Sequence, residues 1–349
     1  MRSSYQEKDV ILLLKDITGM VAPQSTKERE RLIQSGKHYC EMLPVEYVPS
    51  KNYMEAYEQA IKNNAKSTAL AIGVLADKIM EQRGSQVVLV SLARAGIPIG
   101  ILLKRYIRFK YKIEVAHYSI SIIRGKGIDT NAMKYILQRH QAEDLLFVDG
   151  WTGKGAILKE LEKDMIDFPG VSKQLAVLAD PANITRLCGT HEDILIPSSC
   201  LNATVSGLIS RTFLREDIIG KDEFHGAVYY DKLKQEDLSY AFIRAIQGEF
   251  QLECIEKKSI SSEKGIEEVK RIGVKFAVQD INLIKPGIGE TTRVLLRRVP
   301  WKILIGMEFK EDKSLKHIIR LAKEKNVPIE YYPLKNYKAC GVIKKLADA

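Results

Sequence analysis

A short loop at residues 149–155, DGWTGKG, combines side chains and backbone groups that could bind a phosphate. Asp149 follows four apolar residues, and Thr152 and Lys154 offer a hydroxyl and an ammonium group. The glycines leave backbone N–H groups accessible, and a helix that begins after the loop would add its own N–H groups. The loop therefore predicts a phosphate site, although the same pattern also joins ordinary strands to ordinary helices.

Two earlier loops have similar chemistry. SLARAGIPIG places Arg94 before Gly96, where the backbone can approach a ligand, and SIIRGKGID places Arg124 and Lys126 on either side of a glycine. In a doubly wound sheet the loops at the carboxyl ends of the strands face one crevice. Three such loops at one edge predict a ligand with more than one phosphate.

The elements that must position these loops form a repeating pattern. Short apolar runs, QVVLVSL, KIEVAHYSISII, LLFV and QLAVLAD, alternate with the helical patterns PIGILLKRYIRF and GAILKELEKDM. Alternation of buried strands with amphipathic helices is typical of a parallel sheet with crossover helices. The sequence therefore predicts an α/β fold for this part of the chain.

The positive charge is concentrated at the C-terminal end. The chain has 54 Lys and Arg against 44 Asp and Glu, and residues 255–349 contain 21 of the basic and 12 of the acidic residues. Such an excess on one segment indicates a module with a polyanionic partner, and nucleic acid is the first candidate. A basic surface that only keeps the protein in solution is the alternative.

Polar residues separate this basic segment from the rest. Residues 257–271 are charged and poor in apolar side chains, so we expect domains at 1–254 and 272–349 joined by a linker at 255–271. The second domain is predicted as a small α/β/α unit. Its expected elements are a strand at VKFAVQD, a helix at GETTRVLLRR, a strand at WKILIGM, a helix at SLKHIIRLAKEKN, a strand at PIEYYPL and a last helix near GVIKKL.

Composition argues against several protein classes. The five cysteines are odd in number and scattered, which favours reduced thiols over a disulfide framework or a structural zinc site. The longest apolar run near the start is too short to cross a bilayer and has no signal-peptide pattern. We therefore expect a cytoplasmic protein without a membrane partner.

Several longer segments resemble the bacterial StiP family, which is phosphoribosyltransferase-like although its label also names a cysteine protease. The matching segments are DVILLLKDI, IQSGKHYCEMLP, SLARAGIPIG, FVDGWTGKGAI and SGLISRT, spread over roughly the first 240 residues. The resemblance implies a Rossmann-like type I phosphoribosyltransferase core with a hood over the acceptor site. It also implies a role in tellurite resistance or stress response.

This resemblance implies an enzyme that glycosylates a base with magnesium-bound phosphoribosyl pyrophosphate. Asp149 would hold the ribose and the substrate-bound magnesium, and Arg124 and Lys126 would meet the pyrophosphate. These enzymes usually have two adjacent acids, whereas this chain has one, so a catalytically silent sensor of the same ligand with an RNA or protein partner is the alternative. The implied substrate-binding residues are Arg94, Ala95, Gly96, Gly150, Trp151, Thr152, Gly153, Lys154, Gly155, Ala156, Ser206 and Arg211.

A cysteine protease is the third interpretation. It needs a thiol with a histidine in reach, and Cys200 has His191 nearby in the sequence. No recognisable turn around Cys200 would form an oxyanion site, so we rank this interpretation last.

The tail resembles the pelota-type RNA-binding domain, over about the last 80 residues. PGIGETTRVLLRRVPWKILI and the later YKACGVIKKL carry the resemblance. Gly289 stands where related kink-turn binders have an asparagine, so we expect weak sequence preference, and a protein-interaction domain is the alternative. The implied RNA-binding residues are Gly289, Glu290, Thr292, Arg293, Arg297, Arg298 and Lys302.

Overall fold

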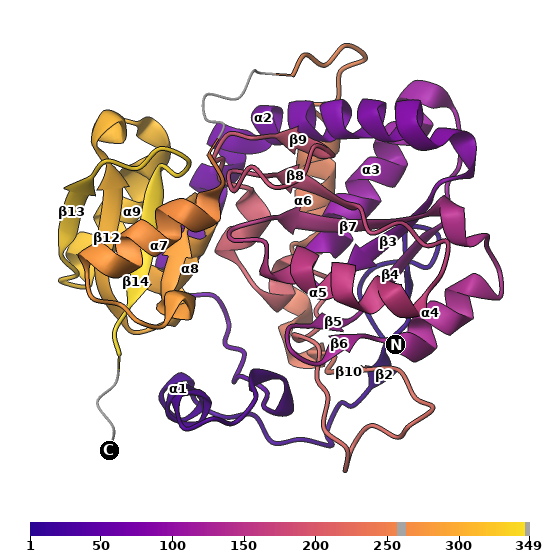
Figure 1. Ribbon diagram of the computed structural model, residues 1–349, viewed down its shortest axis with the longest axis horizontal. Helices are drawn as coiled ribbons and strands as arrows, with labels where there is room; N and C mark the ends of the chain where they lie inside the picture. Colours follow the sequence, from indigo (N-terminus) through magenta and orange to yellow (C-terminus); the bar gives the residue numbers. More distant parts are fainter. Residues whose placement is uncertain (257–262, 346–349) are drawn as a thin grey trace.

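The computed structural model describes residues 1–256 and 263–345 (Figure 1). Its N-terminal part is built on a six-stranded sheet with the order β1–β4–β3–β7–β8–β9, in which all neighbouring strands are parallel. The strands are β1 (Ile11–Leu12), β3 (Val88–Leu92), β4 (His117–Ile120), β7 (Leu145–Trp151), β8 (Leu175–Ala179) and β9 (Cys188–Thr190). The predicted parallel sheet is confirmed.

Helices cover both faces of this sheet, which explains why its strands are continuous apolar runs. One face packs against α2 (Lys51–Arg83), α3 (Gly96–Tyr111) and α6 (Ser239–Gln247), and the other against α4 (Thr130–Leu137) and α5 (Ala156–Asp164). Helix α2 crosses β9 so closely that a Cβ at Gly189 would lie 2.3 Å from the carbonyl oxygen of Ala71. Glycine is therefore needed at this crossing.

Smaller elements surround the carboxyl edge of the sheet. Strands β2 (Lys15–Asp16) and β10 (Gly226–Ala227) form a parallel pair. Strands β5 (Ile122–Ile123) and β6 (Gly127–Ile128) form a hairpin whose turn holds Arg124 and Lys126. Helix α1 (Thr26–Gln34), which is capped by Ser25, lies away from the main sheet in Figure 1.

The C-terminal part is a separate sheet with the order β11–β14–β12–β13, in which β12 and β13 are parallel and the other pairs antiparallel. Helix α7 packs on one face with its own apolar cluster, and α8 and α9 pack on the other. The elements are α7 (Gly265–Lys275), β11 (Ile284–Pro286), α8 (Ile288–Arg297), β12 (Pro300–Gly306), α9 (Lys316–Glu324), β13 (Ile329–Tyr332) and β14 (Ala339–Ile343).

Two predicted elements of this part are wrong. VKFAVQD was predicted as a strand, but its first two residues, Val274 and Lys275, are the end of α7 and the others follow the helix. The helix forms because Val269 and Ile272 bury one of its faces. GVIKKL, predicted as a helix, begins within β14, whose five residues are all buried between β11 and β12. The predicted linker at 255–271 includes the start of α7, and its residues 257–262 lie outside the described residues.

In the described parts of the chain, no helix combines the length and the apolar character that crossing a bilayer requires.

Candidate functional site

A cavity of about 1580 Å³ separates the N-terminal sheet from the C-terminal domain. Its walls come from the loop after β3, the turn between β5 and β6, the loop after β7, the region around α1, and one side of α8. The three loops that the sequence predicted at one edge therefore do meet at one cavity. Helix α8, from the other domain, closes its opposite wall.

The structure brings most of the predicted residues to this cavity. Those that line it are Arg94, Ala95, Arg124, Asp149, Trp151, Thr152, Gly153, Lys154, Gly155, Ala156, Arg211, Glu290, Arg293, Arg297 and Arg298. Those that do not line it are Gly96, Lys126, Gly150, Ser206, Gly289, Thr292 and Lys302. Lys126 is exposed, and the Oγ of Ser206 donates to the carbonyl oxygen of Asn202.

The loop after β7 contacts the C-terminal domain. The Nζ of Lys154 donates to the carbonyl oxygens of Ile281 at 2.6 Å and Ile284 at 3.0 Å. Burial, and secondly Lys285, lower the pKa of Lys154 to about 8. The hydroxyl of Tyr337 donates to the carbonyl oxygen of Gly153 at 2.6 Å. This loop therefore positions the C-terminal domain with the groups that the sequence predicted for a phosphate.

Asp149 is a weak candidate for magnesium. Its Oδ1 accepts a hydrogen bond from the N–H of Gly150 at 2.7 Å, and burial raises its pKa to about 7. Magnesium prefers several charged or neutral oxygen ligands, and a single carboxylate that is half protonated near neutral pH fits that preference poorly. Magnesium binding by Asp149 stays a prediction.

Two arginines of the N-terminal part lie deep in the cavity. The Nη1 of Arg94 donates to the carbonyl oxygen of Ile209, and its Nη2 donates to Asn202 Oδ1 at 2.7 Å. The guanidinium of Arg211 stacks over the ring of Tyr39 at 4.6 Å. Arg94 is thus held in place by hydrogen bonds, and Arg211 by an aromatic ring.

Helix α8 directs its basic side chains toward the N-terminal part. The guanidinium of Arg293 lies 4.6 Å from the centre of the Trp151 ring and pairs with Glu290. Arg297 donates to the carbonyl oxygen of Cys200 at 3.2 Å, and Arg298 pairs with Glu30 through two hydrogen bonds of 2.9 Å. These residues were predicted to bind RNA, and the structure places them on the cavity wall.

Two other residues predicted to bind RNA lie elsewhere. The hydroxyl of Thr292 is buried, where it donates to the carbonyl oxygen of Ile288 and contacts the Nε2 of His317 at 2.8 Å. The Nζ of Lys302 pairs with Glu330 at 2.9 Å. Thr292 therefore joins α8 to α9, and Lys302 joins β12 to β13.

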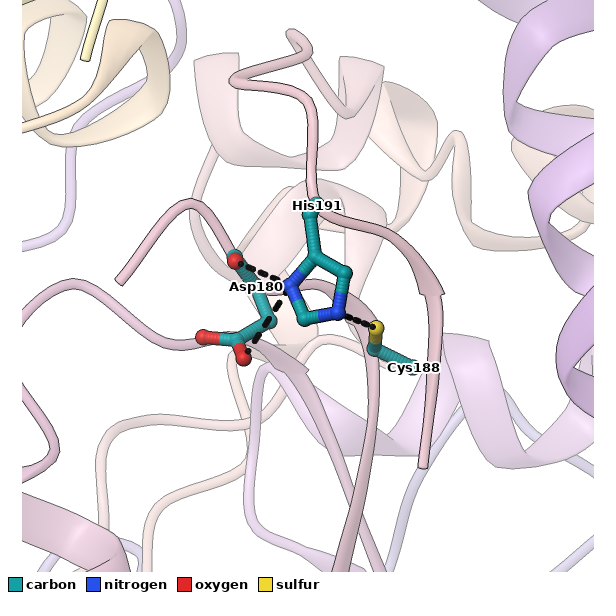
Figure 2. Close-up of side chains that lie close together, drawn as sticks. All are labelled: Asp180, Cys188 and His191. Atoms are coloured by element: carbon teal, nitrogen blue, oxygen red, sulfur yellow. Dashed lines mark hydrogen bonds and ion pairs between the residues drawn. The ribbon is translucent and has the colours of Figure 1, made fainter. Parts of the chain in front are cut away.

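A second constellation lies at the edge of the main sheet, and none of its three residues lines the cavity (Figure 2). Strand β8 ends before Asp180, and the neighbouring strand β9 begins with Cys188 and ends before His191. Because the two strands are parallel and the N–H of Asp180 donates to the carbonyl oxygen of Thr190, Asp180 and His191 leave the sheet side by side. Figure 2 shows the imidazole between the thiol and the aspartate.

The two ring nitrogens of His191 face different partners. Nε2 lies 3.3 Å from the Sγ of Cys188, and Nδ1 lies 3.0 Å from the backbone oxygen and 3.5 Å from the Oδ2 of Asp180. A carbonyl oxygen only accepts, so Nδ1 carries the proton and Nε2 accepts the thiol hydrogen. This order of nucleophile, base and orienting acid is that of a catalytic triad.

Burial shifts the ionisation of both the thiol and the aspartate. Burial raises the pKa of Cys188 to about 12 and that of Asp180 to about 6. The thiol is therefore protonated at neutral pH, and Asp180 is mostly ionised. The Oδ2 of Asp180 is fixed by the N–H groups of Ile184 at 2.7 Å and Thr185 at 2.8 Å.

The same three side chains could be considered as metal ligands. In the described part of the chain they form one group whose donor atoms all lie within 4.8 Å of one another. A metal ion, however, would have to lie at a single point that the Sγ of Cys188, a carboxylate oxygen of Asp180 and one ring nitrogen of His191 all face. Here the nitrogen that faces Cys188 turns away from Asp180, so the geometry favours proton transfer over metal binding.

The predicted pairing of Cys200 with His191 is wrong. Both ring nitrogens of His191 are directed to Cys188 and Asp180, and Cys200 is fully buried in the short helix η5 (Pro197–Cys200). The signal for Cys188 was present in the sequence as CGTH, a thiol three residues before the histidine. Its partner Asp180 could be found only by pairing QLAVLAD with the next strand.

Comparison with known families identifies the chain. Residues 3–247 match the family described as "Tellurite-like stress resistance cysteine protease StiP". The chain belongs to the StiP family. Residues 263–345 match the PELOTA RNA binding domain. A relative named "Cysteine protease StiP" from Acinetobacter baylyi is 36% identical over an aligned length of 366, and the alignment covers 98% of this chain and 94% of the relative. Both predicted resemblances are confirmed, and so is the association with tellurite and stress resistance.

Solved structures show a more distant likeness. A hypoxanthine-guanine phosphoribosyltransferase from Bacillus anthracis is 16% identical, and the match covers 36% of this chain and 77% of that enzyme with a TM-score of 0.28. A second structure of that enzyme, with HEPES in its active site, is 15% identical over 41% of this chain and 75% of the other, with a TM-score of 0.23. At such scores the likeness does not support a shared activity.

The predicted phosphoribosyl transfer is therefore wrong, and so is the alternative of a silent sensor for the same ligand. The StiP relative that spans almost the whole chain is named a cysteine protease, an enzyme of another class. The phosphate-type loops were real features of the sequence. Their lysine, however, is hydrogen-bonded to the C-terminal domain, and burial raises the pKa of their single acid to about 7.

Proposed function

We propose that this StiP protein is a cysteine-dependent peptidase in which Cys188 is the nucleophile, His191 the base and Asp180 the orienting acid. The observation that carries the proposal is the opposed arrangement of the imidazole. Nε2 lies 3.3 Å from the thiol, and Nδ1 lies 3.0 Å from the backbone oxygen and 3.5 Å from the Oδ2 of Asp180. Nucleophilic catalysis by cysteine requires these two contacts. The name of the Acinetobacter relative supports the same class of enzyme.

The steps follow from the positions of the protons. As the Sγ of Cys188 attacks the peptide carbonyl carbon, its proton moves to the Nε2 of His191, and the ionised Asp180 stabilises the resulting imidazolium. His191 then gives the proton to the leaving amine, and a thioester remains on Cys188. Water deprotonated by His191 hydrolyses the thioester, which restores the thiol and releases the carboxylic acid.

Burial sets a condition on this chemistry. The side chain of Cys188 is fully buried, and that of His191 is 17% exposed. Residues 183–186 wrap around Asp180 beside the thiol. The first three of these residues are partly exposed, and the fourth is exposed. Catalysis by these side chains therefore requires the segment to move aside, and the high pKa of Cys188 keeps the thiol unreactive in the arrangement observed.

The test is hydrolysis of fluorescein-labelled casein by the full chain. Cys188→Ala should abolish hydrolysis, and His191→Gln should lower it by at least a hundred-fold, because each removes one half of the nucleophile and base pair. Cys200→Ala is the matched control, since Cys200 is equally buried and its pKa is also raised to about 12 by burial. It should keep full activity.

Two results would overturn the proposal. Hydrolysis that survives in Cys188→Ala would show that the thiol is not the nucleophile. Activity that is lost on chelation with EDTA and returns with zinc would show that the three side chains hold a metal ion instead.

RNA binding by the C-terminal domain is a second proposed function, because residues 263–345 match an RNA-binding family and residues 255–349 hold almost all of the net positive charge. Binding of a labelled oligoribonucleotide should weaken steeply as salt rises, by roughly 0.7 in the logarithmic slope for each phosphate contact on a single strand. Absence of binding at low salt would contradict this function.

A further inference from the structure

The cavity between the two parts of the chain has an unbalanced charge. Its lining contains eleven lysines and arginines and five acids, and six aromatic side chains lie among them. Glu30 is paired with Arg298, and Glu290 with Arg293. Among the residues that the structure describes, the basic side chains of the lining therefore outnumber the acidic ones by six.

The arginines also oppose one another. Burial, and secondly Arg29, lower the pKa of Arg211 to about 10, and burial, and secondly Arg293, lower that of Arg297 to about 9. Among the residues that the structure describes, the buried Nε atoms of Arg29, Arg293 and Arg297 have no hydrogen-bond partner. Guanidinium groups crowded in this way are stabilised by an anion, because each gains an opposite charge and a hydrogen-bond acceptor.

The two walls carry different parts of the cluster. Arg94 and Arg211 belong to the N-terminal part, and Arg293 and Arg297 to helix α8 of the C-terminal domain. An anion that satisfies both walls must bridge them. Arginine forks bind phosphate oxygens with two parallel hydrogen bonds, so a ligand with several phosphates fits this arrangement.

We propose that a segment of single-stranded RNA occupies this cavity, with its phosphates on Arg211 and Arg297 and its bases against the aromatic side chains of the lining. The proposal deepens the RNA binding proposed for the C-terminal domain and rests on it. Its new element is the N-terminal wall, which makes the StiP domain part of the RNA site.

Size and aromatic content favour RNA over a small phosphorylated molecule. The cavity of about 1580 Å³ exceeds the range of about 300–1,000 Å³ that is typical of small-molecule sites. Tyr47 is 66% exposed and Trp301 39% exposed on its rim, where large apolar rings are otherwise unfavourable. Exposed aromatic rings beside arginines are the usual means of stacking unpaired bases.

The test uses the full chain, a fluorescein-labelled dodecamer of uridine and fluorescence anisotropy. Arg211→Gln should weaken binding by about ten-fold and flatten the salt dependence by roughly 0.7, because one phosphate contact is lost. Arg139→Gln is the matched control. Arg139 also stacks on a tyrosine, Tyr135, at 3.6 Å, but it does not line the cavity. It should leave binding unchanged.

A measurement on the unchanged protein gives an independent readout. A dodecamer that contains 4-thiouridine should crosslink under ultraviolet light to peptides that contain Trp151 or Trp301. Uridine monophosphate in millimolar excess should not displace the dodecamer, since it cannot span both walls.

The outcomes distinguish this proposal from the RNA binding proposed for the C-terminal domain, on which it rests. If the intact protein binds the dodecamer but Arg211→Gln binds it equally well, RNA lies elsewhere on the C-terminal domain and the cavity proposal fails alone. If crosslinks fall outside the cavity, or if uridine monophosphate displaces the RNA, the proposal also fails. If the intact protein binds no RNA at low salt, both proposals fail.

Discussion

Asp193 joins the two parts of the chain, and its replacement should loosen that joint. Its carboxylate accepts hydrogen bonds from the N–H of Ile288 at 2.9 Å and from the N–H of Lys338 at 2.9 Å. Ile288 is the first residue of α8, so the carboxylate also faces the positive end of that helix. The side chain is 4% exposed, and water cannot readily replace it.

The expected magnitude follows from these contacts. Asp193→Ala leaves two buried N–H groups without an acceptor, and each such group costs about 1–3 kcal/mol, so the free energy of unfolding should fall by about 2–6 kcal/mol. Asp193→Asn keeps one acceptor oxygen and the shape of the side chain. Its loss should be smaller than that of the alanine variant.

Urea denaturation at pH 8 measures this effect. Trp151 and Trp301 lie in different parts of the chain, so their fluorescence reports both. Asp312→Ala is a suitable control, because Asp312 also accepts from a backbone N–H, that of Ser314, but within the C-terminal domain and near its surface. Asp312→Ala also removes a partly exposed ion pair with the Nζ of Lys338 at 2.9 Å, so the helix cap and the ion pair together should cost about 1–2 kcal/mol.

The refuting result is an unchanged urea midpoint for Asp193→Ala. An equal loss for Asp193→Ala and Asp312→Ala would also refute the reasoning, because it would show that burial between the domains adds nothing to the strength of these hydrogen bonds.

Two further predictions concern the N-terminal part. Burial raises the folded-state pKa of Asp149 to about 7 from 3.8, so the stability of the unchanged chain should fall as pH rises through this window. Asp149→Asn should remove that fall and be more stable than the unchanged chain at pH 8 by at most about 4 kcal/mol. The measurement is the urea midpoint of both proteins at pH 5 and at pH 8. An equal change in midpoint between the two pH values in both proteins would contradict this prediction. Gly189→Ala should lose about 1–3 kcal/mol, since its Cβ would lie 2.3 Å from the carbonyl oxygen of Ala71, whereas Gly248→Ala, with no atom closer than 3.4 Å, should melt near the unchanged protein.

The sequence by itself determined the elements of the fold. Continuous apolar runs marked β3, β7 and β8 because a strand covered by helices on both faces must be apolar throughout. The helical repeat marked α8 and α9, because each helix buries one apolar face and leaves the other polar. The failures came where short apolar segments fit either structure, as at β14, whose burial between two strands decided its conformation.

Only the tertiary structure decided which groups act together. The loop at residues 149–155 has the composition of a phosphate site, yet Lys154 binds carbonyl oxygens of a domain more than a hundred residues later. Composition records which groups a loop offers but not what packs against them. Local patterns therefore predicted a phosphate site at this loop, and they did not show that the arginines of α8 lie at the same cavity.

The triad shows the same division most clearly. Cys188 and His191 are close in sequence, so their contact was within reach of local reasoning. Asp180 joins them because β8 and β9 run parallel in adjacent positions, which brings the ends of both strands to the same edge. The pairing of strands is a property of the whole sheet, and this is why the sequence singled out His191 but paired it with Cys200.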